Sequence, residues 1–534
     1  MLVRNPTRTR RTATGVALAA ALSLGIVGAG SPSLGSSASA APLPANIGLA
    51  FETTSIDQIQ ALLKARKGTS VDLVKLYTAR IKQLNSNGPG LNAVRALNPA
   101  AEKEAKAMDA ERRAGKVRGP LHGIPVLLKD NIDVKGMPTT AGSFALKDSY
   151  PADDAPVVKE LREAGAVILG KTNLSEFANF TTSGMPSGYS SLGGQVLNPY
   201  DASQTPSGSS SGSGVAAAVG MAAAAVGTET SGSILSPANA NSLVAVKPTV
   251  GLVSRTGIIP ISATQDTAGP MTKSVYDAAA MLSGMTGVDA EDPATAGSGP
   301  YDDTDYTTSL STTALQGARL GYIQPNQPNE LFTAALDTLR AEGATLVPVT
   351  VTNTQAPSIL TLEFERDLDA YLARLPESAP MDSLTDIVEF NKTQPDRMKF
   401  GQTLLVESEA VDLSDPATLA SYEAARAQGL TESRAAIDSV LQANDLDAIV
   451  SPQSTTGVAA RAGYPSVIVP AGYFAANHRP GGISFAGTAY SEASLLGLAF
   501  DYEKASMLRR GPSEINPTLF QCLDGLPKET WCAP

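Results

Sequence analysis

Short apolar segments alternate with helical segments between residues 124 and 230, and this alternation constrains the fold more than any other feature. The expected elements are, in order, a strand over 124–128, a helix over 155–164, a strand over 166–169, a helix over 211–221 and a strand over 223–226. Strands that alternate with helices form a largely parallel sheet covered by helices on both faces. The sequence therefore predicts an α/β protein, with its chemistry beyond the carboxyl ends of the strands.

The segments on either side extend this pattern without a convincing linker. Helices are expected from Ser55 and from Thr69 or Ser70, each of which can cap a run with helical apolar spacing, and also over residues 99–113 and 355–445. Residues 287–312 are polar and rich in Asp, Thr, Gly and Pro, which favours a surface loop. Strands return over residues 448–450 and 466–469. We expect one domain over residues 41–515.

The first forty residues have the layout of a secretory signal peptide. Arginines at positions 4, 8, 10 and 11 precede an apolar run over residues 15–30, and Ala38-Ser39-Ala40 offers a small-residue cleavage site. The apolar run is too short for a spanning helix, although an uncleaved anchor is the alternative. The Arg10-Arg11 pair allows twin-arginine export, and Sec export stays equally open. We expect a secreted mature protein.

Charge excludes several classes of partner. Residues 1–40 contain four arginines and no acidic residue, so their removal changes the formal net charge from −11 to −15. A protein this acidic is a poor partner for nucleic acid or an anionic membrane surface. No later segment is suited to span a bilayer, and the oligomeric state stays open.

Histidine and cysteine are scarce. The two histidines, His122 and His478, and the two cysteines, Cys522 and Cys532, are too few for a typical zinc or iron site. We therefore expect no metal and no cofactor. The cysteines lie close together in a chain predicted to be exported, which indicates a disulfide that closes a C-terminal tail over residues 516–534.

A Gly/Ser segment over residues 207–214 allows three interpretations. A flexible linker is the simplest, but an Ala-rich helix follows at once and a second Gly/Ser loop follows at 231–233. A nucleophile elbow of the G-x-S-x-G type needs a preceding apolar strand and a histidine base, and residues 198–206 form no such strand. The third interpretation is a family resemblance.

Several ordered blocks carry that resemblance. Residues 119–130 (GPLHGIPVLLKD), 207–213 (SGSSSGS), 227–234 (GTETSGSI) and 247–251 (KPTVG) resemble, in order and spacing, the blocks of the amidase signature family. The resemblance extends from about Ser55 to Lys504. Residues 247–255 and 262–270 are most similar to bacterial peptide amidases. The family fold implied is a large mixed central sheet covered by helices on both faces.

The resemblance also implies the roles of individual residues. Ser233 matches the serine nucleophile, Ser209 the middle serine that follows a cis peptide bond, and Lys129 the base. The substrate-binding and oxyanion positions that it implies are Thr230, Ser231, Gly232 and Ala178, with backbone N–H groups from 230 to 233 as oxyanion donors. The implied reaction is hydrolysis of a carboxamide through an acyl-enzyme, without a cofactor.

Physical chemistry makes a lysine base reasonable. A serine hydroxyl is a weak nucleophile until a base takes its proton, and a free lysine with a pKa of about 10.4 is protonated at neutral pH. Burial at the end of a strand disfavours the ammonium form, and lowering its pKa to about 7 corresponds to roughly 4–5 kcal/mol. Lys171 also follows a strand and is the competing candidate, although it matches a structural Lys-Thr-Asn turn.

The sequence departs from the family pattern at four positions. Ser231 and Ser211 stand where glycine is usual, Leu235 where many members have arginine, and Glu229 where aspartate is commoner. Peptide amidases also carry a residue other than glycine at the position of Ser231. The substrate that the resemblance favours is a peptide C-terminal amide, with other small amides, aryl amides, fatty acid amides and an inactive secreted binding protein as alternatives. Residues 175–200 and 355–405 are expected to form the pocket walls.

We predict cleavage after Ala40 on export, because small residues at positions 38 and 40 satisfy the signal peptidase. N-terminal sequencing of protein recovered from the culture medium should begin at Ala41. A mature protein that retains Met1, or that starts well inside the chain, would contradict this prediction.

Overall fold

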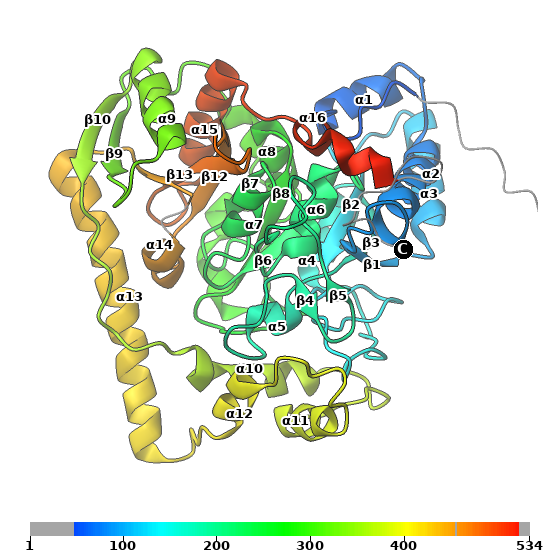
Figure 1. Cartoon of the computed structure of the whole chain (residues 1–534), viewed down its shortest axis with the longest axis vertical. Helices are drawn as coiled ribbons and strands as arrows, with labels where there is room; N and C mark the ends of the chain where they lie inside the picture. The colour runs from blue at the N-terminus through cyan, green and yellow to red at the C-terminus, as the bar shows by residue number, and fades with distance from the viewer. Residues whose placement is uncertain (1–46, 454–455, 523–534) are drawn as a thin grey trace, which may run out of the picture. The chain divides into compact units, whose positions relative to one another are not determined.

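The computed structural model describes residues 47–453 and 456–522 of the chain. Those residues contain an 11-stranded sheet with helices around it (Figure 1). The predicted signal peptide and the predicted disulfide partner Cys532 lie outside the described residues, so both stay predictions.

The central sheet is mixed, as the family resemblance implied. Its spatial order is β1 (Val94–Leu97), β3 (Val167–Thr172), β2 (Pro125–Lys129), β6 (Ala224–Glu229), β8 (Thr267–Thr272), β7 (Val244–Lys247), β12 (Ser466–Tyr473), β13 (Pro480–Ala486), β11 (Ala448–Pro452), β9 (Arg319–Ile323) and β10 (Thr345–Val349). A separate small sheet pairs β4 (Tyr189–Ser190) with β5 (Gly194–Gln195).

The expectation of a largely parallel sheet is wrong. The pairs β3–β2, β2–β6, β11–β9 and β9–β10 are parallel, and the six other neighbouring pairs are antiparallel. The strand–helix alternation is real around β2, β3 and β6, where three strands run parallel. In the middle of the sheet, the neighbouring strands β8, β7, β12 and β13 are antiparallel to one another. Antiparallel neighbours need no crossover helix between them.

Sixteen α-helices lie in the described part of the chain. They are α1 (Ile56–Lys64), α2 (Ser70–Ile81), α3 (Ala101–Arg113), α4 (Pro156–Glu163), α5 (Glu176–Asn179), α6 (Ser211–Ala218), α7 (Leu235–Ala240), α8 (Val275–Ser283), α9 (Glu330–Ala341), α10 (Leu360–Leu372), α11 (Leu384–Lys392), α12 (Thr403–Glu409), α13 (Pro416–Asn444), α14 (Thr456–Ala462), α15 (Glu492–Ser506) and α16 (Pro512–Ile515). Ser55 and Thr69 are the N-caps of α1 and α2, as the spacing predicted.

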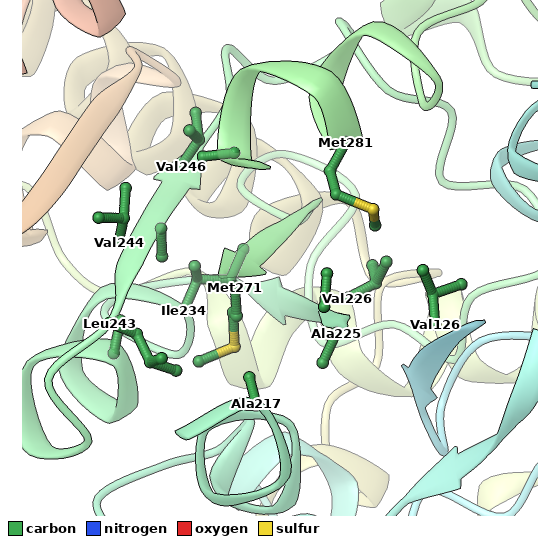
Figure 2. Packing of buried hydrophobic residues seen from close by; sticks show 14 of the residues in the cluster. Val126, Ala217, Ala225, Val226, Ile234, Leu243, Val244, Val246, Met271 and Met281 are labelled. Carbon is green, nitrogen blue, oxygen red and sulfur yellow. The ribbon is translucent and has the colours of Figure 1, made fainter. Parts of the chain in front are cut away.

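Small residues let helix α6 approach one face of the sheet closely. In Figure 2, Ala217 of α6 points toward Met271 of β8 from one side of the sheet, while Met281 of α8 lies on the other side. A Cβ atom added to Gly227 of β6 would lie 2.8 Å from Ser210 Oγ. The Ala- and Gly-rich composition of α6 and β6 therefore brings the Gly/Ser segment against the sheet.

A second, smaller apolar cluster joins the strand ends to α10, α11 and α12, which lie beside α5 in Figure 1. Phe177, Phe364 and Ile259 belong to it, and the ring centroids of Phe177 and Phe364 are 5.9 Å apart. This cluster attaches the three helices to the loops that follow β3 and precede β8. The predicted mainly helical region over residues 355–445 is confirmed.

The predicted surface loop over residues 287–312 is wrong in part. It contains three short 3₁₀ helices, Pro293–Gly297, Gly299–Tyr301 and Tyr306–Ser309, and Tyr306 is buried in the core. The polar composition did not indicate this buried tyrosine, because most of the other residues in the segment face solvent. No helix in residues 47–453 or 456–522 is long and apolar enough to cross a membrane.

We predict that Gly212→Ala destabilises the protein, because the added Cβ would lie 2.3 Å from the carbonyl oxygens of Ala93 and Asn173. The expected loss in the free energy of unfolding is about 1–3 kcal/mol, measured by chemical denaturation. Gly457→Ala is the matched control, since a Cβ at this helical glycine meets nothing within 4 Å. An equal loss in both variants would contradict the close packing of α6.

Candidate active site

Lys129 is the last residue of β2, all of whose residues are buried. Strand β6 runs parallel to β2 with Val226 opposite Leu128, so the residues just beyond Val226 lie beside Lys129. The Lys129 Nζ atom lies 2.8 Å from Ser209 Oγ, 2.9 Å from Thr228 Oγ1 and 3.2 Å from the Thr228 carbonyl oxygen. All three partners are oxygen atoms, and none carries a formal charge.

Burial determines the ionisation of this amine. Desolvation lowers the pKa of the Lys129 ammonium from 10.5 to about 7, against the opposing effect of the carboxylates of Asp266 and Glu229. A neutral amine has two N–H donors and one lone pair. It can therefore donate both hydrogens to Thr228 and accept the hydroxyl hydrogen of Ser209. The contacts are compatible with a neutral lysine that acts as a base.

Hydrogen bonds hold Ser209 in place through its neighbours. The peptide bond that precedes Ser209 is cis, as the family resemblance implied. The Ser209 carbonyl oxygen accepts the Ser175 N–H (3.1 Å), and the Ser210 N–H donates to the Ser233 carbonyl oxygen (3.2 Å). The Ser210 Oγ donates to the Thr228 carbonyl oxygen (3.1 Å). The Gly/Ser segment is thus an ordered, buried turn into α6 and not a linker.

Glu229 organises the loop that carries Ser233. Its carboxylate accepts the backbone N–H groups of Gly232 (2.7 Å), Ile234 (2.8 Å) and Leu235 (3.0 Å). Three backbone donors therefore converge on one buried carboxylate at the start of α7. These three bonds hold the loop from within its own sequence, over the six residues that follow Glu229.

The same contacts refine the expected oxyanion donors. The Gly232 N–H is already bound to Glu229, whereas the backbone N–H groups of Thr230, Ser231 and Ser233 donate to no other residue in the described part of the chain. Ser231 is exposed and Ser233 is 8% exposed, so the loop reaches solvent at this point. Thr230 donates its hydroxyl to Asp266.

Ala178 lies in a turn of unusual backbone conformation. The φ angles of Phe177, Ala178 and Asn179 are +47°, +54° and +73°, in the left-handed region that residues other than glycine seldom adopt. Glu176 anchors the turn by accepting the Ser191 N–H (2.6 Å). No described contact joins Ala178 to the Ser233 loop, so its substrate-binding role stays a prediction.

The competing candidate bases lie elsewhere. Lys171 Nζ pairs with Asp130 (3.1 Å) in a fully buried ion pair and also contacts Thr139 Oγ1 (3.2 Å). His122 is buried with its Nε2 2.9 Å from the Met108 carbonyl oxygen, and His478 is exposed between β12 and β13. Residues 198–206 form no strand, so the elbow interpretation also lacks its structural basis.

Thr228 and Asp266 were given no role in the sequence analysis, although both contact the predicted residues. The sequence could have indicated Thr228. It lies in the family block over residues 227–234, just after the strand expected over 223–226. Asp266 could not have been indicated, because its contact with Thr230 spans 36 residues. No group of three or more His, Cys, Asp or Glu side chains in the described part of the chain is arranged to hold a metal ion.

Comparisons with known proteins give the family. A model of the Amidase family matches residues 72–461. The chain belongs to the amidase signature family. A probable amidase of Arabidopsis thaliana is 40% identical over 503 residues, covering 90% of this chain and 95% of that protein.

Solved amidase structures are also similar. The native peptide amidase of Stenotrophomonas maltophilia is 45% identical with a TM-score of 0.82, covering 87% of this amidase and 99% of that chain. A peptide amidase in complex with the competitive inhibitor chymostatin is 44% identical with a TM-score of 0.81, covering 87% and 100%. The protein is a hydrolase that acts on amide C–N bonds, as the sequence predicted.

We predict that kcat/KM for amide hydrolysis rises with pH through an apparent pKa near 7. Lys129 is the predicted base, only its neutral form can accept a proton, and burial lowers the pKa of its ammonium to about 7. The fraction of neutral amine, and with it the rate, is therefore lost as the pH falls below 7. An initial-rate profile from pH 5 to 9 measures this limb, and a rate that is flat below pH 7 would contradict it.

Proposed function

We propose that this protein is a secreted amidase in which Ser233 is the nucleophile, Ser209 relays the proton and Lys129 is the base. The observation that carries the proposal is the buried Lys129 Nζ, 2.8 Å from Ser209 Oγ and surrounded by uncharged oxygen atoms. The hydrogen bond between Ser210 N–H and the Ser233 carbonyl oxygen supports it further, because it places the two serine loops side by side.

Acylation follows from these positions. Ser233 Oγ transfers its hydrogen to Ser209 Oγ while Ser209 transfers its own hydrogen to the neutral Nζ of Lys129. Ser233 Oγ bonds to the amide carbon, and the carbonyl oxygen becomes an oxyanion. The backbone N–H groups of Thr230, Ser231 and Ser233 are the donors that remain available to it, and one such donor is worth about 3 kcal/mol in the transition state.

Collapse of the tetrahedral intermediate completes the first half-reaction. The C–N bond breaks, and the Lys129 ammonium returns its proton through Ser209 to the leaving nitrogen. An ester between the acyl group and Ser233 remains. Water then attacks this ester with the same proton relay and releases the acid, so the enzyme returns with neutral Lys129.

The substrate class we propose is a peptide C-terminal amide or a similar small amide. Support comes from the peptide amidases at 44–45% identity over 87% of the chain, one of them in complex with chymostatin. Ser231 is exposed beside the nucleophile, where an extended substrate could reach it. Ser211, the other departure from glycine, is buried and donates to the Ser207 carbonyl oxygen (2.5 Å), which is a structural contact.

We predict that Ser233→Ala abolishes both turnover and covalent labelling by a fluorophosphonate probe, because no other group forms the acyl-enzyme. Lys129→Ala should lower kcat by at least about 10²–10⁴-fold, since general-base help and leaving-group protonation vanish together. Ser209→Ala should lose less if water replaces the relay. Ammonia release from a panel of peptide amides and small amides measures turnover.

The matched controls are His122→Ala and His478→Ala, which should keep most activity if circular dichroism shows a folded protein. A dead histidine variant beside a folded Lys129→Ala enzyme of near-normal kcat would refute the Ser–Ser–Lys assignment. Probe labelling of Ser233 without hydrolysis of any amide would instead favour the inactive binding protein.

A further inference from the structure

Asp266 connects the nucleophile loop to a segment that precedes β8. Its carboxylate accepts the Thr230 hydroxyl on one oxygen and the backbone N–H groups of Ile261 (2.7 Å) and Ser262 (3.0 Å) on the other. Gln265 adds a bond from its Nε2 to the Thr230 carbonyl oxygen (3.3 Å). Residue 230 is thus held by its side chain and by its main chain, three positions before Ser233.

The segment that carries Asp266 is itself fixed. Glu363 of α10 accepts the hydroxyl groups of Ser262 and Thr264, and Asp367 accepts the Ala263 N–H (2.6 Å). Carboxylates on α10 therefore clamp residues 262–264 from outside. The position of Asp266 beside Thr230 follows from this clamp and not from the local sequence alone.

Charge gives Asp266 a second effect. Two carboxylates act on Lys129, that of Asp266 more strongly and that of Glu229 less, and both favour the ammonium form. The charge of Glu229 also acts on the buried Lys247, and the charge of Arg255, which is paired with Asp292 (2.6 Å), acts on Asp266. Burial raises the pKa of the Asp266 carboxyl to about 6, so Asp266 carries a negative charge above that pH and acts on Lys129 without a hydrogen bond to it.

We propose that Asp266 is an electrostatic positioning residue of the amidase reaction, which fixes Thr230 and the nucleophile loop and stabilises the ammonium that Lys129 becomes during attack. The proposal rests on the assignment of Lys129 as the base. In the transition state, one proton moves to Lys129 and one negative charge develops on the substrate oxygen. The carboxylate of Asp266 is already in place, so it stabilises the Lys129 ammonium without any rearrangement of solvent.

Asp266→Asn separates charge from hydrogen bonding. The amide oxygen can still accept the N–H groups of Ile261 and Ser262, and the Thr230 hydroxyl can rotate to accept from the amide nitrogen. Loss of the carboxylate removes a negative charge that stabilises the ammonium, so the pKa of Lys129 should fall further. The rising limb of the pH profile should therefore move to lower pH by about one unit.

The experiment measures the second-order rate constant of fluorophosphonate inactivation from pH 5 to 9, with no amide substrate present. In Asp266→Asn the limb should move down by about one pH unit, and the plateau rate should fall about tenfold, since one pKa unit corresponds to a tenfold change in equilibrium. A plateau that falls without movement of the limb would overturn the proposal and leave Asp266 a purely structural role. An unchanged profile would overturn it as well.

Asp367→Asn is the matched control, because Asp367 binds the same segment but is not among the charges that act on Lys129. Its limb should stay at the wild-type pH. Asp266→Ser provides a second neutral variant if Asp266→Asn fails to fold, and it should show the same shift. A wrong assignment of Lys129 as the base would give a different result. The wild-type profile would then have no rising limb, or the Lys129→Ala variant would react with the fluorophosphonate as fast as the wild type.

Discussion

The desolvation of one lysine side chain is the constraint on which the site depends. Lys129 is buried at the end of β2, and within residues 47–453 and 456–522 its amine has hydrogen bonds to the hydroxyl of Ser209 and to the two oxygens of Thr228. Lys171 is equally buried on the neighbouring strand β3, opposite Leu128, yet it pairs with Asp130 at 3.1 Å. The two lysines lie at the ends of neighbouring strands, but only Lys171 has a carboxylate as a direct partner. Lys129 can therefore be neutral.

Close packing brings the rest of the site to this amine. Alanine and glycine in α6 and β6 let the Gly/Ser segment lie directly on the sheet, where Ser210 bonds both the N–H and the carbonyl of Thr228. The Glu229 carboxylate then accepts the backbone N–H groups of Gly232, Ile234 and Leu235 in the next turn. Hydrogen bonds of Ser210 and Glu229 therefore position the two serine loops, and larger side chains in α6 and β6 would separate them.

The sequence predicted the parts of this arrangement that are encoded locally. Helix caps at Ser55 and Thr69, and the strands ending at Lys129 and Glu229, follow from spacing and from family blocks. The antiparallel half was missed because β8, TAGPMT, contains glycine and proline and lacks a strand-like apolar alternation. Asp266 and the buried Tyr306 were missed because their environments are created by segments distant in sequence.

Direct titration of Lys129 tests the central claim. Carbon-13 at the ε position of lysine reports ionisation by NMR, and the Lys129 signal is assigned as the one absent from Lys129→Arg. The account predicts a chemical-shift change with a midpoint near pH 7, because burial lowers the pKa of this ammonium to about 7. A Lys129 signal that stays in the ammonium form up to pH 9 would contradict a neutral lysine base.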